Sequence, residues 1–141
     1  MENIVYTLGD SVYINLTNRC SNNCEFCVRV GESFKKYGLW LEHEPSAQEI
    51  IEALKDYHTD EIVFCGFGEP LYRLDVMLEV ADYAHAHGMR TRVNTNGQAK
   101  LIAGAEDAAK RMQGKLDKVN VSLNASTAQG YQDICKCEFG E

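Results

Sequence analysis

The sequence contains no apolar run of the length needed to cross a bilayer, so it predicts no transmembrane helix. Its start, MENIVYTLGD, has neither a basic stretch nor a long apolar stretch, and it therefore does not look like a secretory signal. Linkers, low-complexity tracts and residue-level repeats are also absent. These absences predict one cytoplasmic domain over residues 1–141, with no membrane partner.

Positive charge is also scarce. Fourteen Lys and Arg against 21 Asp and Glu give a net charge of −7. This balance argues against broad binding of a nucleic-acid backbone, although a local basic groove could still exist. Hydrophobic residues make up 45%, which is enough for a core without disulfide bonds. Six cysteines without a secretory signal therefore indicate metal or redox chemistry.

Three of the cysteines, Cys20, Cys24 and Cys27, lie within eight residues. Their segment is rich in Asn and Ser and follows a strand pattern, so it is predicted to be a loop. A structural zinc site would need four ligands. A 4Fe–4S cluster held by three thiolates would keep one iron open, as a reactive cluster requires. A fourth ligand could still come from Cys65, Cys135, Cys137 or His43.

Strand and helix patterns alternate along the rest of the chain. Strands are predicted at 3–8, 11–16, 61–65, 90–97 and 117–124, and helices at 45–58, 74–87, 98–114 and 126–135. Gly9–Asp10 predicts a hairpin between the first two strands. Ser46 and Glu49 form a capping-box pattern at the first helix. The order predicts an α/β fold with parallel strands and right-handed crossovers.

The unusual residues follow the predicted strands. The cysteine segment follows the second strand, GFGEP (66–70) the third, NTNG (94–97) the fourth, and VSLNA (121–125) ends the fifth. Ligands of parallel α/β folds bind at the carboxyl ends of the strands. The sequence therefore predicts that these segments meet in one site.

Together these motifs resemble those of the radical S-adenosylmethionine (radical SAM) enzymes. Cys20, Cys24 and Cys27, with Phe26 before the last cysteine, resemble the family's cluster loop at 20–27. GFGEP resembles the GGEP motif, with Phe67 in place of one glycine, and NTNG and VSLNA resemble the motifs of later strands. CSNNCEFC, FCGFGEPL and VNTNGQA look most like the small members linked with TatD-type hydrolases.

The resemblance implies a partial (β/α) barrel of the radical SAM type that is truncated at its C-terminus, without the last strand–helix units. It also implies a 4Fe–4S cluster on the three cysteines and S-adenosylmethionine chelated at the open iron. Reductive cleavage would give a 5′-deoxyadenosyl radical that takes hydrogen from an unknown small-molecule or peptide substrate. Expected partners are an electron donor such as flavodoxin or ferredoxin, and a second copy bound through an open sheet edge.

No catalytic residue is assigned beyond the cluster. The residues expected to bind the cosubstrate are Phe26, Gly66, Gly68, Glu69, Pro70, Asn94, Asn96, Ser122 and Asn124. Glu69 would accept a hydrogen bond from the methionine ammonium.

Simpler roles stay open at several of these positions. Phe26 could be a core aromatic, Gly66 and Gly68 could form a turn, and Asn124 could cap a helix. Two other readings of the whole chain also stay open: a zinc-stabilised binding module, and an inactive radical SAM-like scaffold for a partner protein.

Overall fold

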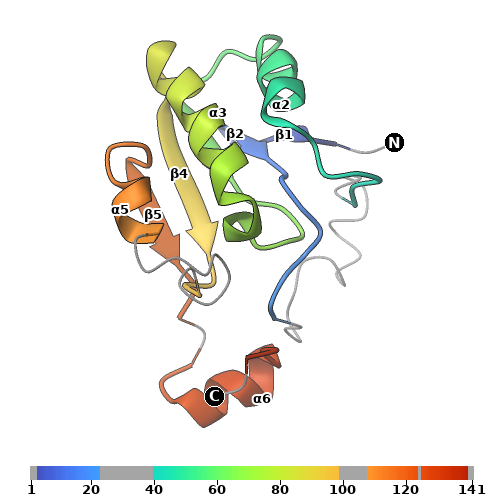
Figure 1. Ribbon diagram of the computed structural model, residues 1–141, viewed down its shortest axis with the longest axis vertical. Helices are drawn as coiled ribbons and strands as arrows, with labels where there is room; N and C mark the ends of the chain where they lie inside the picture. Colours follow the sequence, from blue (N-terminus) through green and yellow to red (C-terminus); the bar gives the residue numbers. More distant parts are fainter. Residues whose placement is uncertain (1–2, 23–39, 99–107, 124, 140–141) are drawn as a thin grey trace.

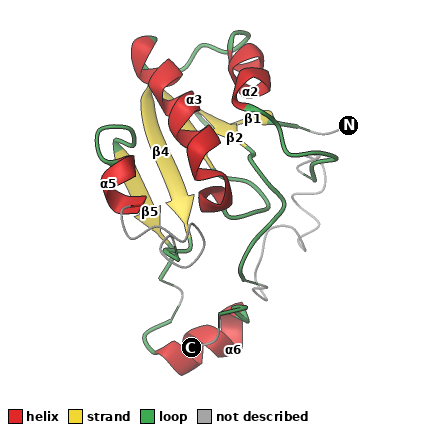
Figure 2. Cartoon of the chain, viewed as in Figure 1, coloured by secondary structure: helices red, strands yellow, loops and turns green. Residues whose placement is uncertain are grey.

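The computed structural model describes residues 3–22, 40–98, 108–123 and 125–139. Five strands form one sheet in the order β1-β2-β3-β4-β5, and Figure 2 shows it beside the helices. The strands are β1 (Val5–Leu8), β2 (Ser11–Ile14), β3 (Glu61–Phe64), β4 (Arg90–Thr95) and β5 (Lys118–Val121). The helices are α2 (Ala47–Leu54), the 3₁₀ helix η2 (Pro70–Arg73), α3 (Leu74–Ala86), α5 (Ala108–Met112) and α6 (Ala128–Cys135).

The hairpin predicted at Gly9–Asp10 is confirmed. Strands β1 and β2 pair antiparallel, with Leu8 opposite Ser11 and Val5 opposite Ile14. Gly9 has a φ of +61°, a conformation that glycine adopts without the steric cost other residues incur. This short turn fixes the register of the first pair.

The parallel part of the sheet is also confirmed. Strands β2, β3, β4 and β5 pair in parallel in their order along the chain. The Ser46–Glu49 capping box is present at the start of α2. This helix ends at Leu54, however, so His58 lies in the following loop and not on the helix as predicted. Residues 99–107 of the helix predicted at 98–114 lie outside the described residues.

The hydrophobic core lies between the sheet and the helices. Figure 1 shows α2, α3 and α5 on the same face of the sheet. Alternate strand residues point toward them, and Ile14, Ile62 and Phe64 are fully buried. They pack in one cluster with Ile50 of α2 and Met77 of α3. All helices of the described core therefore cover one face, as they do on the outside of a barrel.

Strand β5 forms one edge of the described sheet. Val119 and Val121 point toward the helix side but are exposed, by 43% and 58%, and Leu123 beyond the end of the strand is 76% exposed. The open edge that the sequence predicts is thus present among the described strands. Dimerisation through it stays a prediction. The helices described here are all too short or too polar to cross a membrane.

Asp117 joins the amino ends of β4 and β5. Its Oδ2 accepts hydrogen bonds from the backbone N–H of Thr91 and from His85 Nε2, both at 2.8 Å. The hydrogen bond from the Thr91 N–H is the main reason why the pKa of Asp117 lies below its ordinary value, and the contact with His85 adds to it. The ionised form is therefore the one that the folded chain favours.

We expect Asp117→Asn to lower the thermal midpoint at neutral pH by about 2–4 °C. Because the folded pKa is lowered, this stabilisation is present above the unfolded pKa of Asp and is lost as pH falls through the folded value. The difference in thermal midpoint between wild type and variant should therefore disappear at acidic pH. Thermal unfolding from pH 7 to pH 2 measures it, with exposed Asp56→Asn as control. A difference in thermal midpoint that is equally large at every pH would contradict this explanation.

Candidate active site at the carboxyl ends of the strands

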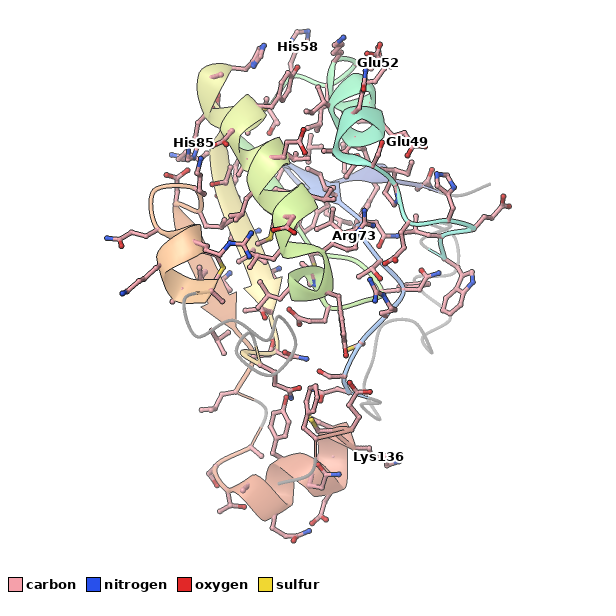
Figure 3. The ribbon with its side chains drawn as sticks, in the orientation of Figure 1. Glu49, Glu52, His58, Arg73, His85 and Lys136 are labelled. Carbon is pink, nitrogen blue, oxygen red and sulfur yellow. The ribbon has the colours of Figure 1, made fainter. Side chains whose placement is uncertain are left out.

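The chain leaving β2 is held firmly before it reaches the first cysteine. Asn15, Leu16 and Thr17 are almost completely buried. The guanidinium of Arg73 donates to Leu16 O at 3.0 Å and to Pro45 O at 2.7 Å. Figure 3 shows Arg73 between the start of α3 and this chain. One side chain thus fixes both the segment that leads to Cys20 and the segment before α2.

A second contact closes the base of the loop that carries the cysteines. Asn18 Nδ2 donates to Leu41 O at 2.7 Å, and Leu41 N donates back to Asn18 Oδ1 at 3.0 Å. Cys20 lies just beyond this clamp and is half-buried. Its sulfur accepts the N–H of Asn22 at 3.5 Å. The predicted ligands Cys24 and Cys27, and the predicted cosubstrate residue Phe26, lie outside the described residues.

The GFGEP turn packs directly against this segment. A Cβ at Gly66 would lie 2.2 Å from Asn15 Oδ1, and one at Gly68 would lie 2.2 Å from Thr17 O. Glu69 N donates to Arg19 O at 2.7 Å. Both glycines are therefore required for contact between two parts of the chain itself. Whether they also admit a ligand stays a prediction.

Glu69 is the buried centre of the site. Its side chain accepts hydrogen bonds from Thr95 Oγ1 at 2.6 Å, from Asn96 N at 2.8 Å and from Leu71 N at 3.3 Å. Burial raises the pKa of this carboxyl, although the three hydrogen bonds act in the opposite direction. Glu69 thus ties η2 to the turn after β4, with Pro70 buried as the first residue of η2. Among the described residues, Asn96 N is the single donor to Oε2, so one lone-pair position of this oxygen has no donor there.

The turn after β4 meets the cysteine segment through amides. Asn96 Nδ2 donates to Ser21 Oγ at 2.9 Å, and Ser21 Oγ donates to Gln98 Oε1 at 2.5 Å. Gln98 Nε2 donates to Asn22 Oδ1 at 3.1 Å. NTNG and the cysteine segment are therefore in direct contact, as their positions at the carboxyl ends of parallel strands predict.

Helix α6 completes this polar network. Figure 1 shows it beyond the carboxyl ends of β4 and β5. Asn22 Nδ2 donates to Tyr131 OH at 2.7 Å, and Glu138 N donates to Ser21 O at 2.8 Å. Cys137 Sγ contacts Gln98 Oε1 at 3.3 Å. The C-terminal segment thus lies against the residues that follow Cys20.

The remaining predicted motif, VSLNA, also begins at this end of the sheet, beside NTNG. Asn120 Nδ2 donates to Asn94 Oδ1 at 3.3 Å, and Ser122 N donates to Thr95 O at 2.9 Å. Ser122 itself is exposed, and Asn124 lies outside the described residues. Cosubstrate binding by Asn94, Asn96 and Ser122 stays a prediction.

The other cysteines do not form a second metal centre within the described ranges, where no three His, Cys, Asp or Glu side chains are grouped for a metal. Cys135 and Cys137 are buried. Cys65 is only partly buried and lies on the sheet face away from the helices.

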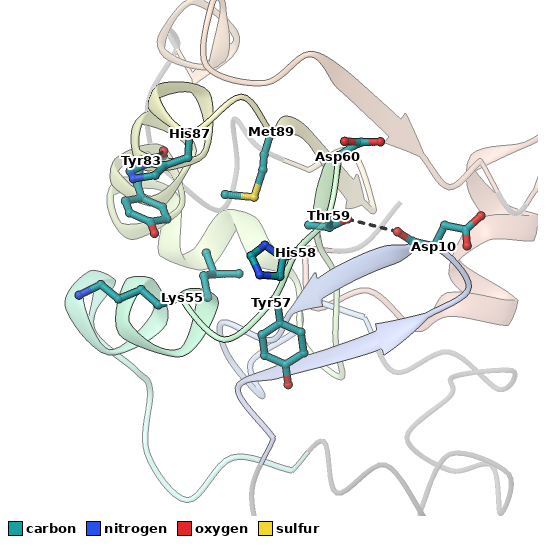
Figure 4. A pocket seen from close by; sticks show the side chains of 10 residues that line it. Asp10, Lys55, Tyr57, His58, Thr59, Asp60, Tyr83, His87 and Met89 are labelled. Atoms are coloured by element: carbon teal, nitrogen blue, oxygen red, sulfur yellow. Dashed lines mark hydrogen bonds between the residues drawn. The ribbon is translucent and has the colours of Figure 1, made fainter.

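A hollow of about 640 Å³ lies at the opposite end of the sheet (Figure 4). It is lined by residues that precede the parallel strands, among them Asp10, Asp60 and Met89, and by His58 and His87. Because ligands of parallel α/β folds bind at the carboxyl ends, this hollow is not the candidate site. It is a gap between the loops after α2 and α3.

Sequence reasoning missed several residues of the site. Arg73 directly precedes the helix predicted at 74–87 and has no place in the four motifs, but its side chain is only 15% exposed. Thr95, Gln98 and Tyr131 carried no metal or charge signal, and their importance comes from partners far away in the sequence. The position of Thr95 inside NTNG was the only local sign.

The Radical SAM superfamily profile matches residues 14–138, a range that contains every motif described above. The chain belongs to the radical SAM superfamily. Enzymes of this superfamily use a 4Fe–4S cluster and S-adenosylmethionine. The match confirms the family that the four motifs predict.

Curated radical SAM relatives cover most of this chain. It is 34% identical over 113 residues to Fe-coproporphyrin III synthase from Methanosarcina barkeri, which is 78% of this chain and 26% of that protein. It is 32% identical over 128 residues to a protein named "Probable GTP 3′,8-cyclase" from Methanocella arvoryzae, 91% of this chain and 38% of the relative. The chain therefore spans about a quarter to two fifths of the length of these relatives.

Proposed function

We propose that Cys20, Cys24 and Cys27 hold a 4Fe–4S cluster and that the chain binds S-adenosylmethionine for reductive cleavage. When bound, the cluster would supply the electron that breaks the C–S bond and yields a 5′-deoxyadenosyl radical for hydrogen abstraction. The observation that supports this most is the direct contact between the cysteine segment, GFGEP and NTNG at one end of the sheet.

The described residues fit such a group in two ways. The half-buried thiol of Cys20 already accepts a backbone N–H, as the sulfurs of iron–sulfur ligands do. The chain before it is fixed by Arg73, Asn18 and Gly68, so that Cys20 is presented from a rigid base. Glu69 lies beside the same segment, with room for one more donor on Oε2.

Anaerobic purification and reconstitution with iron and sulfide test the proposal. We expect iron and sulfide in a 4Fe–4S ratio, and 5′-deoxyadenosine after addition of a reductant and S-adenosylmethionine. Stoichiometric zinc without iron would favour a zinc-stabilised binding module. A cluster without any cleavage would favour an inactive scaffold.

Glu69→Gln is expected to weaken S-adenosylmethionine binding about 10–150-fold, the equivalent of about 1.5–3 kcal/mol for a hydrogen bond to a charged group. Glu69→Ala should also lower the free energy of unfolding by about 2–4 kcal/mol, because Thr95, Asn96 and Leu71 lose a buried acceptor. Titration of the reconstituted chain, followed by the EPR signal of the cluster, measures the first effect, and denaturant unfolding measures the second. Exposed Glu79→Gln on α3 is the control. Unchanged affinity in Glu69→Gln would leave Glu69 with a structural role alone.

A further inference from the structure

The sheet face away from the helices carries a row of polar side chains. Strand side chains alternate, and residues paired in register point to the same side. Because Ile62 and Val93 point into the helix-covered core, their neighbours Glu61, Arg92 and Asn94 point the other way. The same register adds Tyr13, Lys118 and Asn120, and these six residues are called the inner face.

This composition is unusual for the inside of a (β/α) barrel. Such interiors are filled mainly by branched apolar side chains, which need no polar partner. Here the row across the strands runs from Tyr13 through buried Val63 to Arg92 and Lys118. Polar side chains at such a position cost desolvation unless they meet polar groups, as they do in a ligand site.

Arg92 is only partly satisfied by its own chain. Its side chain is 18% exposed. Its Nη2 donates to Tyr13 OH at 3.2 Å and lies 3.8 Å from Glu61 Oε1, too far for a hydrogen bond. Its Nε is buried and has no hydrogen-bond partner among the described residues. A guanidinium has five donors, and one of them donates a hydrogen bond to a described residue, so the others are available to a ligand.

The charge of the inner face is positive although the chain as a whole is acidic. Lys118 lies beside Arg92 in register and makes no ion pair within the described ranges. Glu61 is the single acidic member, and it also accepts a hydrogen bond from Ser11 Oγ at 3.1 Å. Two cations therefore face one partly engaged carboxylate.

We propose that Arg92 and Lys118 bind an anionic group, a carboxylate or a phosphate, of the substrate. This inference rests on the proposed function and adds the class of substrate to it. Arg92 precedes Asn94 by two residues, about 7 Å along the strand. The anionic end of the substrate would lie beside Arg92 and Lys118. The rest of the molecule would extend past Asn94 and Asn120 toward the cysteine segment.

Titration calorimetry of the reconstituted chain with inorganic phosphate and, separately, with malonate tests the proposal at constant ionic strength. We expect saturable binding of at least one probe, and the tighter one indicates which anion the site prefers. Arg92→Gln and Lys118→Gln should each raise its Kd about tenfold. Arg111→Gln on α5 and Lys55→Gln at the end of α2 are matched controls. Each removes one positive charge, as the test variants do, but from the side of the sheet that the helices cover.

If Arg92→Gln fails to fold, Lys118→Gln alone tests the proposal, because Lys118 is exposed and its replacement should not disturb folding. Binding that is not saturable, or that is equally tight in Lys118→Gln and the controls, overturns the inference. The cleavage assay separates the two proposals. Cleavage without anion binding overturns the inference alone, whereas anion binding without cleavage overturns the substrate role together with the proposed function.

Discussion

Replacement of Cys20 by Ala is expected to abolish the iron, the sulfide and the visible absorbance of the reconstituted chain, and Cys24→Ala and Cys27→Ala should do the same. The reason is the number of ligands: with only two thiolates left, the cluster loses a third of its protein attachment. Cys20 has the firmest structural basis, because Arg73 and Asn18 fix the chain just before it. Iron and sulfide analysis after anaerobic reconstitution gives the measurement.

The chain offers its own controls for this prediction. The other three cysteines lie elsewhere. Cys65 is on the same side of the sheet as the inner face, Cys135 is the buried last residue of α6, and Cys137 is buried just after it. Replacement of each by Ala should preserve the cluster. Loss of iron in Cys137→Ala would identify a fourth protein ligand and would contradict the open iron on which the proposed chemistry depends.

Features that depend on neighbouring residues were predictable from the sequence. The Gly9 turn and the Ser46–Glu49 capping box involve residues within a few positions of each other, and the structure contains both. The meeting of the motifs was also predictable, because parallel strands bring their carboxyl ends to one side. The end of α2 was not: the helical pattern continues to His58, but the helix ends at Leu54.

Features that depend on distant partners were not predictable. The buried position of Arg73 comes from carbonyl groups of Leu16 and Pro45, which are 57 and 28 residues away in the sequence. The orientation of Arg92 away from the helices follows from the register of three strands. No local pattern contains this information, which is why neither Arg73 nor Arg92 was predicted as a site residue.

Gly68→Ala is expected to lower the free energy of unfolding strongly. The added Cβ would lie 2.2 Å from Thr17 O and 2.6 Å from Arg19 O, both backbone atoms. A flexible side chain could turn aside, but this backbone is held by Arg73 and by the Glu69 N–H. We therefore expect a loss of about 3 kcal/mol in the free energy of unfolding, at the upper end of the usual cost of overpacking. Denaturant unfolding measures it.

The same substitution should also reduce cluster content, because the chain displaced by the new methyl group leads directly to Cys20. Gly66→Ala provides a graded comparison, since its Cβ would meet the side chain of Asn15, which can turn aside more easily than backbone. Gly130→Ala in α6 is the matched control: its Cβ would lie 3.0 Å from the Thr127 hydroxyl, and alanine favours the helix. We expect stability and iron content to fall together in the order Gly130→Ala, Gly66→Ala, Gly68→Ala. Full iron content in a destabilised Gly68→Ala chain would show that the cysteine loop does not depend on its contact with the GFGEP turn.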